Sequence, residues 1–328
     1  MLNDKKFVLG IDLGGTKIYA AVVDQAGKII GAARKRTKSE LGFEAVADRI
    51  VICAQEALTD AQKTINDIDA IGIGSPGPLD LKEGTIIETP NLGWKNAPLK
   101  AKVEKALEKP VAVDNDGNLG LLGEYAFGAG HQAEHMVGLF VGTGIGGGII
   151  IDRKLLHGFN ENAAELGHMI IDPEGPRCGC GRKGCLEAFA SRLAIEREIR
   201  IAALHGVPTR IFDGKTDLNE RIRSKRLAEA FHSGDQAVIS AVRKSATYLG
   251  YGVANLLNML NPQVVIIGGG VVEALGKSYI DMVKETALGN VFPIAARNVE
   301  IVAASLKDDS AVLGAAVLAW NLVGRLRP

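Results

Sequence analysis

An internal duplication constrains the fold of this chain more than any other feature of its sequence. Residues 7–30 have the pattern of a strand, a glycine-rich turn and a second strand, and residues 135–156 repeat that order. Helical and strand-like segments follow each copy. The repeat predicts two α/β domains of one kind, with one glycine turn from each facing the cleft between them.

The segments around the two copies predict where the domains divide. A third strand near residues 29–35 completes a β-meander, and helices are predicted over residues 44–62, 98–108, 191–232, 235–259 and 310–322, with strands between them. We expect a small first domain over residues 1–118 and a larger second domain over residues 119–307. The helix over about 308–328 is expected to return to the first domain.

Composition excludes several classes of partner. Lys plus Arg equals Asp plus Glu, at 38 each, so no overall field attracts nucleic acid or an anionic membrane. No apolar run reaches the roughly 18 residues of a membrane span. The first strand begins at Phe7, which leaves no room for a signal peptide. We therefore expect a cytoplasmic protein with a neutral small-molecule substrate and no disulfides.

Two glycine-rich turns occupy equivalent places in the two copies, at residues 12–17 and 142–148. Glycine lets a backbone approach phosphate closely and point N–H groups at it, and Thr16 and Thr143 add hydroxyl donors. A pair of tight hairpins is the alternative, since glycine is the usual turn residue. A Walker A loop is excluded, because Thr16 and Lys17 lead into a strand instead of a helix.

A third glycine run, at residues 268–270, stands between the apolar segment QVVII and a helical pattern. We predict a strand-to-helix turn there, which could bring backbone against the sugar or base of a nucleotide. The run at residues 142–148 resembles a dinucleotide fingerprint only loosely, because it leads into a strand. A Rossmann fold is therefore not favoured.

The segment VDNDGN, residues 113–118, places two carboxylates and an amide at the end of a strand and the start of a helix. Asp116 is placed to act as the general base for a hydroxyl nucleophile, at the carboxyl end of a strand beside a cleft. The alternative is that Asp116 caps the helix. The sequence allows both roles at once.

Three of the four cysteines, Cys178, Cys180 and Cys185, lie within eight residues, and Glu165 and His168 lie upstream. A C-x-C-x4-C spacing with a preceding histidine is typical of a structural zinc site with one histidine and three cysteine ligands. The alternative is a group of unrelated core cysteines. Glu165 and His168, three residues apart, would face the same way on a helix.

These motifs together resemble the ROK family of sugar kinases and repressors, in the actin-like, hexokinase-like ATPase superfamily. The segments that carry the resemblance follow the family's order over nearly the whole chain: DLGGTK, SPGP, VDNDGN, GTGIGGG, ELGH, CGCGRKGCLE and GGG. The resemblance implies an α/β fold of two actin-like (RNase H-like) domains with a duplicated β-meander. It also implies transfer of phosphate from ATP to a sugar hydroxyl, with Mg²⁺ bridging the phosphates.

The resemblance further implies a role for each residue that matches a family motif. Asp116 matches the catalytic base. The residues that match sugar contacts are Gly77, Pro78, Asn115, Glu165, His168 and Glu187. The residues that match nucleotide-binding segments are Asp12, Gly14, Gly15, Thr16, Lys17, Gly142, Thr143, Gly144, Gly146, Gly147, Gly268, Gly269 and Gly270. The residues that match ligands of a structural Zn²⁺, which would fix the loop presenting Glu165 and Glu187, are His168, Cys178, Cys180 and Cys185.

Two positions depart from the family pattern. Ala164 stands where glycine is usual before the glutamate, and Asp114 stands where glutamate is common. Because residues 168–191 look closest to the glucokinases of the family, we expect phosphorylation of the 6-hydroxyl of a hexose, with glucose first. Kinases for fructose, mannose, N-acetylglucosamine or N-acetylmannosamine are the alternatives, as is a non-enzymatic sugar-binding regulator.

The regulator alternative is disfavoured in its DNA-binding form. Repressors of the family carry an N-terminal helix-turn-helix, whereas here the first phosphate motif begins at Asp12. We therefore expect no nucleic-acid partner and no membrane partner. Sugar and nucleotide are the expected small-molecule partners, and a homodimer or homotetramer is the expected assembly.

Overall fold

The computed structural model describes residues 7–89, 92–130, 133–212 and 220–325. Two compact units divide the chain: unit 1 contains residues 1–133, 148–164 and 308–328, and unit 2 contains residues 134–147 and 165–307. These units group residues by their packing. The domain boundary that the sequence suggests, after residue 118, stays a prediction.

The first sheet belongs to unit 1 and has the strand order β3-β2-β1-β4-β8. Its strands are β1 (Phe7–Leu13), β2 (Lys17–Asp24), β3 (Ile29–Arg36), β4 (Ile68–Ser75) and β8 (Val111–Asn115). β1, β2 and β3 form an antiparallel meander, whereas β4 and β8 run parallel to β1. β1 and β4 are buried along nearly their whole length, as expected for strands covered on both faces.

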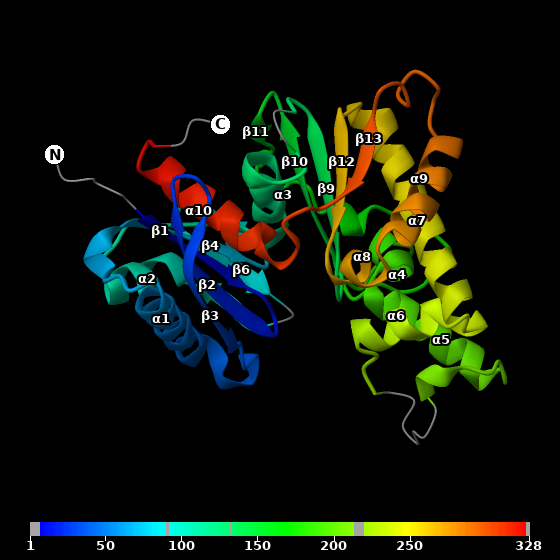
Figure 1. Cartoon of the computed structure of the whole chain (residues 1–328), viewed down its shortest axis with the longest axis horizontal. Helices are drawn as coiled ribbons and strands as arrows, with labels where there is room; N and C mark the ends of the chain where they lie inside the picture. Colours follow the sequence, from blue (N-terminus) through cyan, green and yellow to red (C-terminus); the bar gives the residue numbers. More distant parts are fainter. Residues whose placement is uncertain (1–6, 90–91, 131–132, 213–219, 326–328) are drawn as a thin grey trace. The chain divides into compact units, whose positions relative to one another are not determined.

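Helices cover both faces of this sheet. In Figure 1, α1 (Gly42–Asp60, blue) lies on one face and α10 (Ser310–Leu322, red) lies on the other. Gly10 and Gly72 let α10 approach closely, because a Cβ on either would lie about 2 Å from a carbonyl oxygen of that helix. α2 (Leu99–Leu107) packs beside α1, and α3 (Asp116–Phe127) packs against α10.

The second five-stranded sheet has the order β11-β10-β9-β12-β13. Its strands are β9 (Met136–Val141), β10 (Ile145–Ile151), β11 (Lys154–Leu155), β12 (Val264–Gly268) and β13 (Glu300–Ala303). β12 runs parallel to both β9 and β13, while β10 and β11 are antiparallel. This order repeats that of the first sheet position by position, so the predicted duplication is confirmed.

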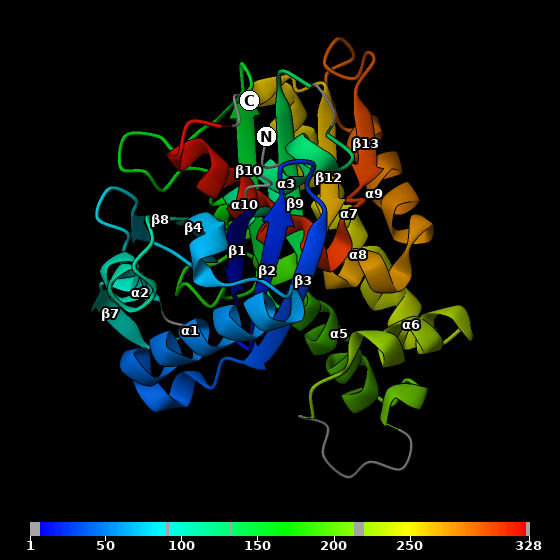
Figure 2. The same ribbon diagram turned by 60° about the vertical axis from the view of Figure 1, so that its left-hand side comes forward.

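Unit 2 adds a layer of helices beside its strands. They are α4 (Leu186–Ala190), α5 (Arg192–Leu204), α6 (Ser224–His232), α7 (Gln236–Leu260), α8 (Gly270–Leu275) and α9 (Lys277–Gly289). Figure 2 shows α9 (orange) beside β13, and α7 packs along α9. The long helix predicted from residue 235 begins at Gln236, with Asp235 as its N-cap. Residues 213–219, within the predicted charged helices, lie outside the described part.

A small sheet in unit 1 escaped sequence prediction. It has the order β5-β6-β7, with β5 (Leu79–Asp80), β6 (Thr85–Thr89) and β7 (Trp94–Ala97). The 3₁₀ helices are η1 (Ser39–Leu41), η2 (Ile65–Asp67), η3 (Leu166–His168), η4 (Arg210–Phe212) and η5 (Lys307–Asp309). Among the described residues, none of the helices has both the length and the apolar character to cross a membrane.

Candidate active site

The first predicted phosphate turn joins β1 to β2 in unit 1. The N–H of Gly14 donates to the carbonyl of Lys17 (2.9 Å), so the turn is a tight hairpin. Thr37 fastens it, since its hydroxyl donates to the carbonyl of Gly14 (2.7 Å) and its N–H to that of Thr16 (3.0 Å). Lys17 begins β2, which confirms that this is no Walker A loop. The hairpin is compatible with phosphate binding, because Thr16 stays exposed.

Asp12 lies near the end of β1 beside this turn and is partly buried. Burial, and next repulsion from Asp116, raise the pKa of the Asp12 carboxyl to about 7. Lys17 acts against this rise, but its ammonium pairs with Asp308 at 3.1 Å, and Asp308 adds to the rise. Two carboxyl groups that repel each other are a donor set suited to a divalent cation such as Mg²⁺.

The carboxyl ends of three parallel strands gather the predicted sugar-side residues of unit 1. Asp12 of β1 pairs in register with Gly74 of β4, and Ser75 of β4 pairs with Asn115 of β8. The Gly77–Pro78 peptide, which is cis, follows β4, and a Cβ on Gly77 would lie 3.5 Å from Nδ2 of Asn115. Ligands of open α/β sheets bind at this edge.

Asn115, and not Asp116, is the N-cap of α3. The Oδ1 atom of Asn115 accepts hydrogen bonds from the N–H groups of Gly117 (2.8 Å) and Asn118 (3.3 Å). The alternative role of Asp116 as cap is therefore wrong, because Asp116 is already the first residue of the helix. Its Oδ1 atom accepts a hydrogen bond from the adjacent N–H of Gly117, at 2.9 Å. The predicted role of Asp116 as general base is left without a competing capping role.

A histidine that the motifs did not single out supports this junction. Asp114 is 1% exposed, and its Oδ2 atom lies 2.7 Å from Nε2 of His157. Its other oxygen accepts from the N–H of Asn115 (2.7 Å) and from Nδ2 of Asn118 (3.0 Å). The hydrogen bond with Asp114 raises the pKa of His157. No local signal marks this pair, because the two residues are 43 positions apart.

The second predicted phosphate turn lies in unit 2 and is shorter than expected. It spans residues 142–144 between β9 and β10, and the N–H of Gly142 donates to the carbonyl of Gly144 (2.9 Å). Gly146 and Gly147 therefore lie in a strand instead of the turn. Thr143 is exposed at the tip, and its hydroxyl accepts a hydrogen bond from Arg192 (3.0 Å).

Glu187 holds the other end of the same turn. Its Oε2 atom accepts a hydrogen bond from the N–H of Ile145 (2.9 Å). Gly144 leaves room for this carboxylate, because a Cβ there would lie 2.1 Å from the same oxygen and would displace the Glu187 side chain. The pKa of the Glu165 carboxyl is raised, first by desolvation; His168 opposes the rise, and repulsion from Glu187 adds to it. The three predicted sugar contacts of unit 2 are therefore close enough to interact electrostatically.

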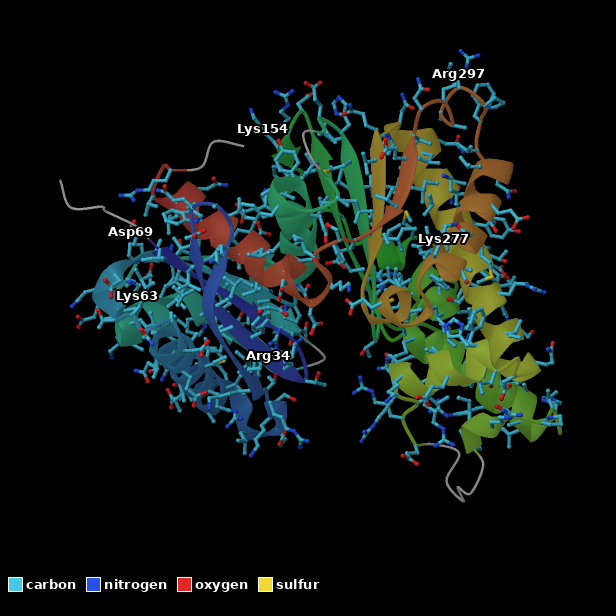
Figure 3. The ribbon with its side chains drawn as sticks, in the orientation of Figure 1. Arg34, Lys63, Asp69, Lys154, Lys277 and Arg297 are labelled. Atoms are coloured by element: carbon cyan, nitrogen blue, oxygen red, sulfur yellow. The ribbon has the colours of Figure 1, made fainter. Side chains whose placement is uncertain are left out.

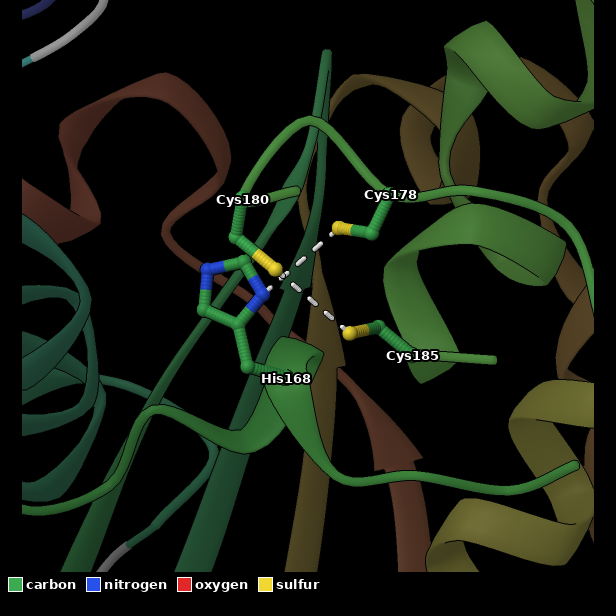
Figure 4. Close-up of side chains that lie close together, drawn as sticks. All are labelled: His168, Cys178, Cys180 and Cys185. Carbon is green, nitrogen blue, oxygen red and sulfur yellow. Dashed lines mark hydrogen bonds between the residues drawn. The ribbon is translucent and has the colours of Figure 1, made fainter. Parts of the chain in front are cut away.

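The predicted zinc ligands converge on one point (Figure 4). One donor atom from each of His168, Cys178, Cys180 and Cys185 lies within 4.8 Å of the other three. The His168 Nδ1 to Cys178 Sγ and the Cys180 Sγ to Cys185 Sγ distances are both 3.7 Å. Sulfur ligands of tetrahedral zinc, at about 2.3 Å from the metal, are roughly 3.8 Å apart. The four residues thus fit a zinc ion.

The third glycine run forms the predicted strand-to-helix turn. β12 ends at Gly268, and α8 begins at Gly270. Gly269 has a φ of +91°, and a Cβ there would lie 2.6 Å from the carbonyl oxygen of Val141, so packing alone requires glycine. Gly268 and Gly269 also line a cavity of about 460 Å³, together with α8, β13 and the start of α9, which contributes Lys277 (labelled in Figure 3).

Comparison with known proteins identifies the family. The sequence profile of the ROK family matches residues 8–321. The chain belongs to the ROK family. The α/β fold inferred from its motifs, that of the hexokinase-like superfamily, is confirmed by the solved structures of ROK proteins that it resembles.

The relatives include both enzymes and repressors. A glucokinase from Halalkalibacterium halodurans is 36% identical over 317 residues, which make up 95% of this chain and 94% of the relative. A solved ROK-family glucokinase from Streptomyces griseus, in complex with glucose and AMPPNP, is 34% identical with a TM-score of 0.85, and the match covers 96% of this chain and 99% of that one. A xylose repressor from Caldicellulosiruptor bescii is 33% identical over 95% of this chain but 77% of its own.

Proposed function

We propose that this protein is an ATP-dependent hexose kinase that transfers the γ-phosphoryl group of ATP to the 6-hydroxyl of glucose. The observation that carries the proposal is the likeness to glucokinases along practically the full length of both chains. The glucokinase is more similar to this chain, at 36% identity, than the xylose repressor, at 33%, which favours a kinase over a regulator. Asp116, which an enzyme needs and a sugar-binding regulator does not, supports the same choice.

Unit 1 would supply the general base and part of the sugar-binding site. Asp116 would take the proton of the attacking hydroxyl as that oxygen bonds to the γ-phosphorus and ADP leaves. Asn115, Gly77 and Pro78, beside it at the edge of the first sheet, would bind other hydroxyls. The Asn115 cap on α3 supports this role, because it fixes the backbone on which Asp116 stands.

The carboxyl group of Asp12, beside the proposed base Asp116, would hold Mg²⁺. The raised pKa of Asp12, caused first by burial and next by repulsion from Asp116, supports this, since a nearby cation would favour the charged carboxylate and so oppose both effects. When bound there, Mg²⁺ would neutralise part of the negative charge of the nucleotide phosphates. The ammonium of Lys17, beside the same turn, is paired with Asp308. Its positive charge is therefore partly neutralised before any phosphate binds.

Unit 2 would supply the nucleotide site and the remaining sugar contacts. The turn at residues 142–144 would bind phosphate oxygens through its N–H groups and Thr143. The cavity beside Gly268 and Gly269 is large enough for a nucleoside, and we propose that it accepts the ribose or base. Glu165, His168 and Glu187 would bind sugar hydroxyls, with His168 using the ring nitrogen that does not face the cysteines.

The cluster of His168 and three cysteines would hold a structural zinc. The Sγ atom of Cys178 lies 3.5 Å from Oε1 of Glu187, so the cluster directly adjoins a proposed sugar contact. Bound zinc supplies a rigid fourfold link between η3 and the segment before α4. We also keep a cytoplasmic homodimer or homotetramer as expectations, and light scattering on the purified protein tests the assembly.

A coupled ADP-release assay tests the function. Glucose should give the highest kcat/KM among glucose, mannose, fructose, N-acetylglucosamine and N-acetylmannosamine. A higher value for another sugar would assign that sugar as the substrate and contradict the glucokinase assignment. If the protein bound one of these sugars but phosphorylated none of the five, a non-enzymatic sugar-binding regulator would be favoured.

A further inference from the structure

Arg192, the first residue of α5, has a buried side chain, which is unusual for arginine. Its side chain is 6% exposed, although charged side chains are almost never buried without partners. Its backbone N–H donates to the carbonyl of Gly142 (3.0 Å), and its Nη2 atom donates to the hydroxyl of Thr143 (3.0 Å). One residue therefore contacts the second turn through both its main chain and its side chain.

The remaining contacts fix the position of the guanidinium. Its Nη1 atom pairs with Glu196, whose side chain is 2% exposed, and donates to the carbonyl of Ile222 (3.4 Å). Glu196 is also paired with Arg200 at 3.0 Å, and Arg221 repels Arg192. The buried carboxylate of Glu196 thus pairs with two guanidinium groups, those of Arg192 and Arg200, and holds the first of them behind the turn.

The hydrogen-bond pattern orients the Thr143 hydroxyl. A guanidinium group can only donate, so the oxygen of Thr143 must be the acceptor in its bond with Arg192. The hydroxyl hydrogen is then directed to some other acceptor. Because Thr143 is exposed at the tip of the turn, that acceptor can be a ligand oxygen.

We propose that Arg192 is a positioning residue for the nucleotide phosphates, which orients Thr143 as a hydrogen-bond donor and places a buried positive charge behind the turn. The proposal rests on the proposed function, because it takes the anion at this turn to be ATP. It assigns to α5 a role that none of the sequence motifs indicated. A purely structural ion pair with Glu196 is the competing explanation.

The test is a double-mutant cycle with Arg192→Met and Thr143→Val. The dissociation constants of AMPPNP without sugar and of glucose without nucleotide are measured by calorimetry, along with Tm. Arg192→Met should weaken AMPPNP binding by about tenfold, the effect of losing a hydrogen bond to a charged group, and change glucose binding by less than about twofold. In the Thr143→Val background the same substitution should cost less than about threefold, because the oriented hydroxyl is gone.

Arg200→Met is the matched control, since it breaks the other ion pair of Glu196 without touching the turn. It should lower Tm but change AMPPNP affinity by less than about threefold. Arg192→Lys, which keeps the charge and loses the forked donor, serves if Arg192→Met fails to fold, and it too should lose its effect in the Thr143→Val background. Equal losses in both backgrounds, or equal losses for both ligands, would overturn the proposal. A wild-type protein that binds neither ligand would overturn the proposed function itself.

Discussion

The two glycine turns occupy equivalent places in duplicated sheets, yet the charged groups around them differ, because the second turn contacts a buried guanidinium, that of Arg192, as well as the carboxylate of Glu187. The first turn adjoins Asp12 and Asp116, which repel each other, and its one cation, Lys17, is paired with Asp308. Behind the second turn stands the buried guanidinium of Arg192. The duplication copied the backbone of the turn and not its electrostatics.

Part of this difference comes from segments outside the duplicated strands. Asp308 precedes the last helix, and Arg192 begins a helix that follows the Cys3His segment. An anionic phosphate can meet the second turn directly, whereas the carboxylates of the first turn require a cation in between. We therefore expect Mg²⁺ at the first turn and direct phosphate contact at the second, and each experiment below tests part of that division.

The largest effect is expected from Asp116→Asn, which removes the proposed base from the acidic side. General-base catalysis contributes about 10² to 10⁴ in rate, so kcat at saturating sugar should fall by at least a hundredfold. Tm should change little, because Asn115 and not Asp116 caps α3. Asp48→Asn, an exposed carboxylate on α1, is the control and should keep full turnover. A variant with more than a tenth of wild-type turnover would exclude Asp116 as the base.

Asp12→Asn tests the acidic surroundings through pH. The raised pKa means that protonated Asp12 favours the folded state below about pH 4, and that this stabilisation is lost as pH rises through 7. Asparagine cannot ionise, so the variant should gain stability relative to wild type between pH 5 and pH 8. We expect a gain on the order of 2 kcal/mol from urea unfolding without Mg²⁺ or nucleotide. If the variant and the wild type differed in stability by the same amount at pH 5 and at pH 8, the pKa of Asp12 would not be raised.

Cys180→Ser tests whether the zinc segment serves the second unit's sugar contacts. Serine is a poor zinc ligand, so elemental analysis should give one zinc per chain in wild type and almost none in the variant. Glucose affinity should fall by about tenfold or more, because metal ligands and their neighbours lose their orientation. Cys53→Ala, a buried cysteine of α1, should keep the zinc. A zinc-free variant that binds glucose normally would limit the cluster to fold stability.

The same variant asks how far the cluster reaches. Glu187 contacts Cys178 through one oxygen and the N–H of Ile145 through the other, so it links the cluster to the second turn. Arg192 holds the opposite end of that turn independently of the cysteines. We therefore expect AMPPNP affinity to change by less than about threefold, and a larger loss would show that Glu187 transmits the disorder.

Two threonine variants compare the turns directly. Thr143→Val removes a hydroxyl that Arg192 orients, and KM for ATP should rise by about tenfold. Thr16→Val removes an exposed hydroxyl for which the described residues offer no partner, so its KM should rise by less than about threefold. Glucose affinity without nucleotide should stay unchanged in both. Equal increases would mean that the two turns contact phosphate alike.

The sequence predicted the features that depend on local pattern. Strand-turn-strand periodicity predicted both meanders, and the spacing of Cys178, Cys180 and Cys185 predicted a cluster that the structure brings within 4.8 Å. Two errors were local as well. Asn115 and Asp116 are both good capping residues, so the pattern could not choose between them. The strands β5 to β7 are too short, at two to five residues, to show a period.

The contacts that set the chemistry of the site could not be predicted in this way. His157 reaches Asp114 across 43 positions and Arg192 reaches Thr143 across 49, and neither pair shares a motif. Burial makes both pairs significant, yet a polar residue's burial depends on the packing of the whole unit. Ala164 could be predicted only in part. The sequence shows that it departs from the family pattern, but it does not show that its φ is +67°.

Ala164→Gly should have the smallest effect and sets the scale for backbone changes near the site. An alanine backbone in the left-handed region costs roughly 1–2 kcal/mol of folding free energy. Glycine relieves this cost, but it loses part of the benefit because the unfolded chain gains conformational freedom. We expect a net stabilisation of about 0.5 to 1 kcal/mol in urea unfolding. Ala163→Gly is the matched control. Ala163 lies next to Ala164 but has no positive φ, so glycine at this position should destabilise the folded protein. Because Ala164 lies in neither turn, AMPPNP and glucose affinities should stay within about twofold of wild type. A change in glucose affinity alone would show that the strained alanine helps to place the adjacent Glu165, and a loss of stability would show that the strain is not there.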